Sequence, residues 1–77
     1  AIYPEIKDWF RNKMGFTAAQ LHSNIKLIEE FQRTFKNSTM IELEETFQYI
    51  SRKGFRPQEN IGWFIQNLKK KIQNAQL

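Results

Sequence analysis

The chain has 77 residues, a formal net charge of +4 and no cysteine. That length suits one compact domain, and without cysteine there is no disulfide framework and no thiolate zinc site. No apolar run approaches the roughly 20 residues that cross a bilayer. We therefore expect a soluble, cytoplasmic protein, because chains without disulfides are typical of reducing compartments. Since the chain begins with Ala1 rather than methionine, we interpret residues 1–77 as a single helical domain excised from a longer protein, although removal of the initiator methionine would leave the same start.

Charge is distributed unevenly along the chain. Residues 1–50 hold six basic and seven acidic side chains, whereas residues 51–77 hold six basic side chains and Glu59 alone. Such a polarity can orient a polyanion or an acidic partner. The eleven aromatic residues (seven Phe, two Trp and two Tyr) supply large apolar area for a core in so short a chain.

The first predicted helix runs from Pro4 to Lys13. Proline is favoured at the first helical position, and apolar residues follow at three- and four-residue intervals. Gly15 is a natural C-terminal stop. Thr17 and Gln20 then form a capping-box pattern that opens a second helix.

The second predicted helix carries apolar residues over a wide arc, which suggests a central element that is contacted on several sides. Polar residues 37–38 interrupt the pattern, and Thr39 with Glu42 reads as another capping box. A third helix follows and ends at Gly54. The apolar residues of these two helices are Ala18, Leu21, Ile25, Leu27, Ile28, Phe31, Phe35, Met40, Leu43, Phe47 and Ile50.

Residues 55–59 contain a proline and predict a turn or a short helical start. Asn60 can cap a last helix, whose apolar stripe has the helical period. The spacing also places Trp9, Phe47 and Phe64 in the core. No segment alternates apolar and polar residues over strand length, so the predicted fold is all-α, a compact bundle of four or five helices. The stripe of the last helix is Ile61, Phe64, Ile65, Leu68 and Ile72.

The residue sets that catalysis requires are missing from the pattern. His22 stands alone beside an apolar arc and is interpreted as a packed or surface residue rather than a ligand. The glutamates at 29–30 and 42–45 lack a histidine partner and the spacing of an oxygen-rich loop, so solvated helix faces explain them better than a metal site. The glycines are isolated and make no phosphate-binding loop. We expect no enzyme activity, no cofactor and no metal.

A helical wheel of the last helix places Trp63 and Lys70 on the side opposite the apolar stripe, with Asn67 between them. Lys69 and Lys71 flank the stripe, with ammonium groups that can reach solvent. An exposed indole beside lysines can stack on an unpaired base or anchor a protein interface. The alternative is that the N-terminal segment covers Trp63 and that the lysines only complement the helix dipole.

Arg52, Lys53 and Arg56 surround the turn before the last helix. They either extend the same positive surface or are solvated loop residues. Gly62 weakens the first turn of the last helix, which indicates a close approach by another helix or by a partner.

Four short segments in the second half of the chain resemble segments of known C-terminal domains. The segments TFQYI at 46–50, GF at 54–55, NIGWFI at 60–65 and LKK at 68–70 are similar to the C-terminal helical domains of DnaD-like primosome proteins and of RepA-type plasmid replication initiators of Gram-positive bacteria. In those families a helix, a turn and a final helix opening with Asn-x-Gly-aromatic close a small bundle.

This resemblance implies a domain that a flexible linker joins to a DNA-binding domain, and that recruits primase or helicase to an origin, with weak single-strand binding. Tyr3, Ile6 and Trp9 are spaced more closely than the tyrosine, isoleucine and tryptophan of the DnaD motif, which favours partner recruitment over direct DNA binding. The leading hypothesis is therefore a replication-initiation accessory domain. The alternatives are a single-stranded nucleic-acid-binding module and an oligomerisation bundle. The candidate contacts are Arg52, Lys53, Arg56, Trp63, Asn67, Lys69, Lys70 and Lys71.

Overall fold

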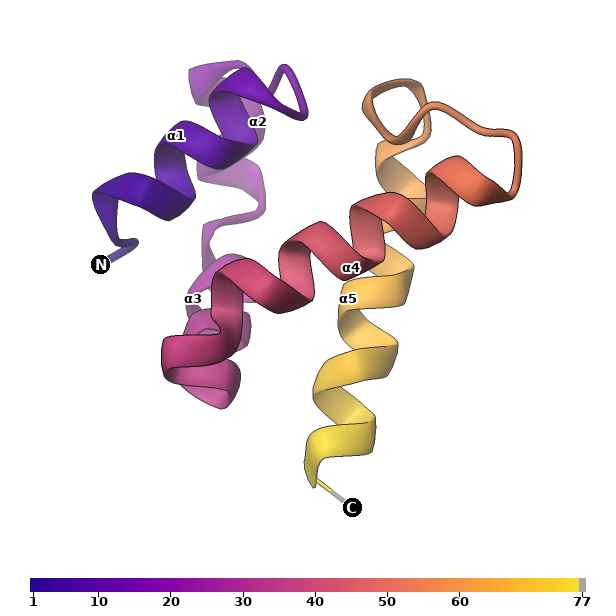
Figure 1. Cartoon of the computed structure of the whole chain (residues 1–77). Helices are drawn as coiled ribbons and strands as arrows, with labels where there is room; N and C mark the ends of the chain where they lie inside the picture. Colours follow the sequence, from indigo (N-terminus) through magenta and orange to yellow (C-terminus); the bar gives the residue numbers. More distant parts are fainter. Residues whose placement is uncertain (77) are drawn as a thin grey trace.

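The computed structural model describes residues 1–76, which form five α-helices and two 3₁₀ turns without a strand (Figure 1). The predicted all-α fold is confirmed. The elements are α1 (Pro4–Asn12), α2 (Ala18–Ser23), α3 (Ile25–Phe35), η1 (Lys36–Ser38), α4 (Thr39–Arg52), η2 (Pro57–Glu59) and α5 (Ile61–Gln76).

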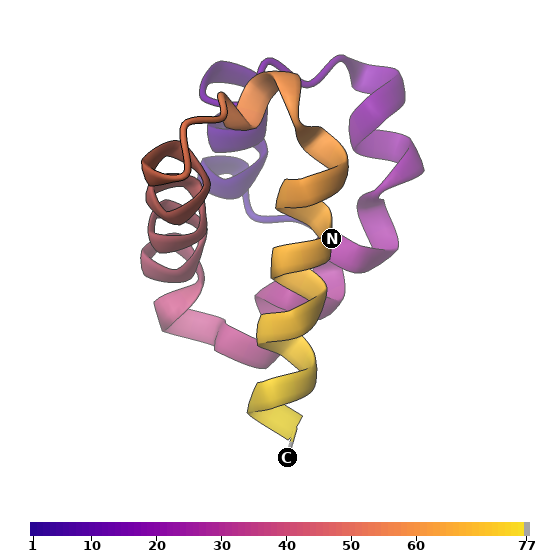
Figure 2. The same cartoon turned by 90° about the vertical axis from the view of Figure 1, so that its right-hand side faces the viewer.

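Helices α3, α4 and α5 pack against one another, and α3 also contacts α2, so the expectation of a helix contacted on several sides is met by α3. Figure 2 shows α5 in front, with α4 on one side and α2 and α3 on the other. Side chains from all five helices and from the loop after α1 fill the space between them. The buried core consists of Ile6, Trp9, Phe10, Met14, Phe16, Leu21, Ile28, Phe31, Leu43, Ile50, Phe64, Leu68 and Ile72.

The second predicted helix is two helices that meet at Asn24. The capping box of Thr17 and Gln20 is confirmed by both of its hydrogen bonds, 3.2 Å and 2.8 Å long. At Asn24, however, the backbone leaves helical geometry, and the side-chain amide donates to the Gln20 carbonyl at 2.8 Å. The asparagine side chain competes with the helix for backbone hydrogen-bond partners. The apolar residues keep the helical period across Asn24, so their pattern did not reveal the break.

The predicted capping box at the start of α4 is wrong. Thr39 is already inside the helix, and its hydroxyl donates to the carbonyls of Lys36 and Gln32 at 2.7 Å and 3.3 Å. Glu42 instead forms an ion pair with Lys71. The threonine therefore joins the end of α3 to the start of α4 rather than capping an exposed helix end.

The N-terminal segment lies against α3. Buried Gln32 accepts a hydrogen bond from the Tyr3 amide at 2.9 Å and donates to the Ala1 carbonyl at 3.1 Å. These bonds hold the segment away from Trp63, whose side chain is 37% exposed. The interpretation in which the N-terminal segment covers that ring is wrong.

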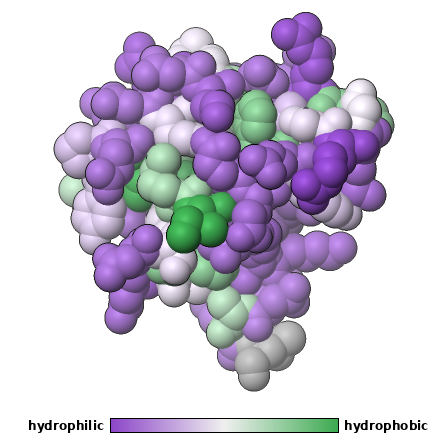
Figure 3. Space-filling view, in the orientation of Figure 1, coloured by the Kyte–Doolittle hydropathy of each residue, from purple (hydrophilic) through white to green (hydrophobic). Residues whose placement is uncertain are grey.

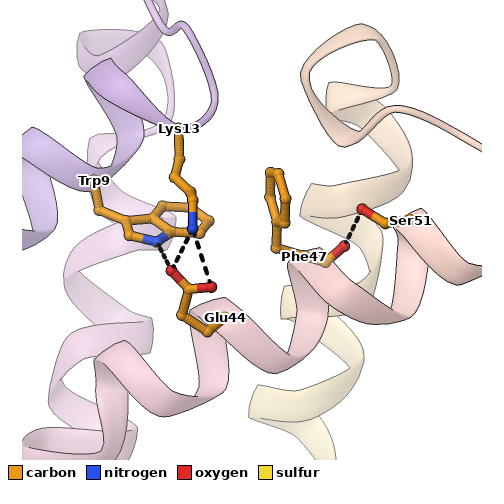
Figure 4. A network of polar contacts seen from close by, with 5 residues as sticks. All are labelled: Trp9, Lys13, Glu44, Phe47 and Ser51. Carbon is orange, nitrogen blue, oxygen red and sulfur yellow. Dashed lines mark hydrogen bonds and ion pairs between the residues drawn. The ribbon is translucent and has the colours of Figure 1, made fainter.

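A small polar network fixes α1 to α4 (Figure 4). The indole nitrogen of Trp9, predicted to be a core residue and buried here, donates to Glu44 at 2.7 Å, and the Lys13 ammonium lies 3.1 Å from the same carboxylate oxygen. The indole hydrogen bond has the largest effect and lowers the pKa of Glu44; burial opposes it, and the hydrogen bond and charge of Lys13 lower the pKa further. Lys13 also lies over the ring of Phe47, which is half-buried against the core. The network sets the orientation of α4.

The connection from α4 to α5 turns at Gly54, whose φ of +88° suits glycine. Buried Pro57 begins η2 and anchors the loop to the core side. Asn60 directly precedes α5 and its carbonyl accepts the Phe64 amide at 3.1 Å, but within residues 1–76 its side chain accepts no amide of α5, so the predicted side-chain cap is not formed. Its side-chain amide donates backward to the Arg56 carbonyl at 3.0 Å. The loop thereby fixes the start of α5 beside the end of α4.

Candidate macromolecule-binding face

The outward face of α5 carries Trp63, as the helical wheel predicts. Phe64, Leu68 and Ile72 of the same helix are buried, and the tryptophan side chain points away from them and is 37% exposed. Asn67 follows one turn later and donates its side-chain amide to the Trp63 carbonyl at 2.9 Å. This bond lies within one turn of the helix.

Two more aromatic residues surround Trp63. Phe55, in the loop after α4, contacts it edge to face with ring centroids 5.1 Å apart. Tyr49 of α4 is also exposed and lines the same hollow as Trp63. We call Tyr49, Phe55 and Trp63 the aromatic cluster. Exposed apolar patches, especially those with tryptophan or tyrosine, are typical of binding surfaces.

Lys53 joins two members of the aromatic cluster. Its ammonium lies 4.8 Å from the ring centroid of Tyr49 and 5.4 Å from that of Trp63. Cation–π attraction at both rings restricts this long side chain. The charge of Lys53 is therefore held in place, with its remaining hydrogen-bond donors available to a partner.

Two shallow hollows lie side by side between α4 and α5 and share Tyr49 and Asn67. The tryptophan hollow has a volume of about 410 Å³ and the Glu45 hollow about 400 Å³. Together they form what we call the α4–α5 face. The tryptophan hollow is lined by Tyr49, Lys53, Trp63, Gln66, Asn67 and Lys70. The Glu45 hollow is lined by Glu45, Thr46, Gln48, Tyr49, Arg52, Asn67 and Lys71.

The positive charges on this face differ in how they are paired. Arg52, Lys53 and Lys70 form no ion pair with any carboxylate in residues 1–76. Lys71, in contrast, lies 2.6 Å from Glu42 and 3.5 Å from Glu45. Lys71 thus connects α5 to α4, whereas the other three cations are available to an anionic partner.

The structure brings together five of the eight residues named from the sequence, with Lys71 at the edge of the same face. The five are Arg52, Lys53, Trp63, Asn67 and Lys70. Lys69 lines a separate hollow between α3 and α5. Arg56 lines another hollow at the α4–α5 loop and pairs with Glu59 at 3.3 Å.

Sequence reasoning missed Tyr49 and Phe55 as members of the face. The helical period of α4 offered a signal for Tyr49, because that residue falls away from buried Leu43 and Ile50. No comparable signal existed for Phe55, since loop residues follow no period. Its contact with Trp63 depends on how the loop returns to α5.

Within residues 1–76 no cluster of His, Asp or Glu side chains could hold a metal ion, and no buried side-chain polar atom lacks a hydrogen-bond partner. Over the same residues no helix combines the length and apolar character needed to cross a bilayer. His22 is exposed. The surface seen in the orientation of Figure 1 is mainly hydrophilic, with hydrophobic groups gathered near its centre where α4 crosses (Figure 3).

Comparisons of the chain with protein-family models, known proteins and solved structures return no match.

Proposed function

We propose that this domain binds a partner protein through the α4–α5 face, as an accessory domain in replication initiation that recruits primase or helicase. The observation that carries the binding proposal is the exposed aromatic cluster beside three unpaired cations. Tryptophan, tyrosine and arginine are the residues that most often dominate interface energetics. All three residue types occur on this face.

The replication part of the proposal rests on sequence resemblance alone. The segments at 46–50, 54–55, 60–65 and 68–70, which resemble DnaD-like and RepA-type C-terminal domains, build the end of α4, the loop and the start of α5. These are also the elements that carry the aromatic cluster. A shared surface is thus a reason to expect a shared kind of partner.

The direct test measures binding of the purified primase and of the replicative helicase from the same organism. We expect Trp63→Ala to weaken binding to one of them by at least about 30-fold, the size of an interface hot spot. Tyr3→Ala is the matched control, because Tyr3 is an exposed aromatic residue held against α3, away from this face. Equal loss in both variants, or tight binding by Trp63→Ala, would refute the proposed face.

A second candidate function is single-stranded nucleic-acid binding, favoured by the same unpaired cations and exposed indole. Phosphate contacts release counterions, so such binding weakens steeply as salt rises. Titration of oligothymidylate at two salt concentrations separates the two functions. Tight, salt-sensitive binding that depends on Trp63 would support this candidate and displace protein docking.

A third candidate is an oligomerisation bundle. Sedimentation over a range of protein concentrations measures it directly. A mass that rises with concentration and is unchanged in Lys70→Glu would support self-association through another surface. A constant monomer mass would remove this candidate.

A further inference from the structure

We infer that the partner binds the α4–α5 face through an acidic segment, and that this segment lies along the face in one chain direction. Its carboxylates contact Arg52 and Lys53 at the end of α4, and its uncharged side chains lie toward the Lys71 ammonium and the glutamates that pair with it. This inference rests on the proposed function and adds the chemistry of the partner to it. Charge complementarity supports it, because Arg52, Lys53 and Lys70, which line the face, lack a carboxylate partner in residues 1–76.

The face has an internal polarity that sets the direction. The end of α4 lies beside the start of α5, where the Lys53 ammonium is 5.4 Å from the Trp63 ring centroid. Toward the other end, Glu42 and Glu45 of α4 surround the Lys71 ammonium. These glutamates would repel a segment that carries negative charge along its whole length. A segment that is acidic at one end only fits the whole face.

The same polarity favours a protein segment over a nucleic acid. A phosphate backbone carries its charge at every residue and would pass Glu45, which is more than half exposed beside Lys71. Trp63 is also poorly placed for base stacking, since Phe55 packs against it and the Lys53 ammonium lies 5.4 Å from its ring centroid. Both features are compatible with a carboxylate that approaches Lys53.

Lys53 is expected to be the strongest anion contact. Its ammonium is restrained by two rings, so less side-chain entropy is lost when a carboxylate binds. Lys70 lines the same hollow, and its ammonium has no cation–π contact with a ring in residues 1–76. Lys53→Met and Lys70→Met make the same charge change on one hollow but differ in this restraint and in position, since Lys70 is next to Lys71 on α5.

The experiment follows the two indole N–H signals of the ¹⁵N-labelled domain by NMR. The probe is a synthetic peptide in which a run of glutamates precedes leucine and phenylalanine, and its control carries glutamines instead. Trp63 reports on the face, while buried Trp9, bonded to Glu44, is the internal control. We expect the acidic peptide to shift the Trp63 signal alone and the glutamine peptide to bind at least about fivefold more weakly.

The variants and a nitroxide label complete the test. Lys53→Met should weaken the acidic peptide about fivefold, Lys70→Met about twofold, and Lys69→Met, in the separate α3–α5 hollow, less than about twofold. A nitroxide at the glutamate end should broaden the Trp63 signal more than one at the phenylalanine end. Equal broadening would overturn the direction.

Two outcomes would overturn the inference. In the first, oligothymidylate shifts Trp63 and binds more tightly than the acidic peptide. In the second, neither peptide binds although primase or helicase binds in a Trp63-dependent manner. The second outcome leaves the proposed function standing, so failure of the two proposals can be told apart.

Discussion

Replacement of Phe64 by alanine tests the packing that turns the outer side of α5 toward solvent. Phe64 is fully buried, with its ring centroid 5.7 Å from Trp9 and 6.1 Å from Phe10. Removing a buried phenylalanine ring costs about 3–5 kcal/mol. A 77-residue domain has a total stability of about 4–12 kcal/mol. Phe64→Ala should therefore remove about a quarter or more of the free energy of unfolding.

Urea unfolding followed by far-UV circular dichroism measures this loss, with Phe55→Ala as the matched control. Phe55 is 47% exposed, so its truncation should cost only about 1 kcal/mol. The expected fall in melting temperature for Phe64→Ala is about 15 °C or more, since each kcal/mol corresponds to about 4–8 °C in a domain of this size. Equal stability losses in the two variants would refute the packing argument.

Three further predictions concern single positions. Gly62→Ala should stabilise the domain by about 0.5–1 kcal/mol, because a Cβ there meets nothing within 4 Å, whereas Gly54→Ala should destabilise it by about 1 kcal/mol because of its φ of +88°; thermal melts of the pair check the sign. The ionised form of Glu44 stabilises the fold at neutral pH, and since its folded pKa lies below the ordinary 4.5, this contribution should be lost as pH falls through the folded value. Glu44→Gln should be less stable at pH 7 and lose this acid dependence, and parallel acid-unfolding curves for both proteins would contradict it. Lys71→Met should cost about 0.5–1 kcal/mol more than Lys69→Met, since only the former removes a half-buried ion pair, which urea titrations can resolve.

The helices were predictable from the sequence because their apolar residues repeat at the helical period. The buried side of α5, including Phe64 and Leu68, follows that period, and so does the outward position of Trp63. The capping box at Thr17 was also predictable, since its two bonds are local. Local pattern therefore accounts for most of the fold and for the main aromatic residue of the face.

Features that depend on contacts between different helices were not predictable. The Thr39 hydroxyl donates to the carbonyl of Gln32 in α3. Lys36, between them, adopts a φ of +47°, which the sequence does not predict for a lysine. Lys71 pairs with Glu42, although the wheel could only place it beside the apolar stripe. In each case the partner comes from a different helix, so the periodicity of one helix holds no information about it.

Gly62 remains the residue whose role the fold explains least. A close approach by another helix within residues 1–76 does not account for it, since the space around its Cβ position is open. Its place in the first turn of α5, directly before Trp63, is compatible with close approach by a partner. Weaker partner binding by the stabilised Gly62→Ala domain would support that interpretation.

Site-specific photo-crosslinking tests the central claim most directly. Gln66 and Gln73 are exposed residues of α5, but Gln66 lines the tryptophan hollow and Gln73 lines the α3–α5 hollow. A benzophenone amino acid is introduced at each position in turn, and the purified primase or helicase is added. We predict a crosslink from position 66 and none from position 73. A complex that crosslinks from position 73 and not from position 66 would contradict the account.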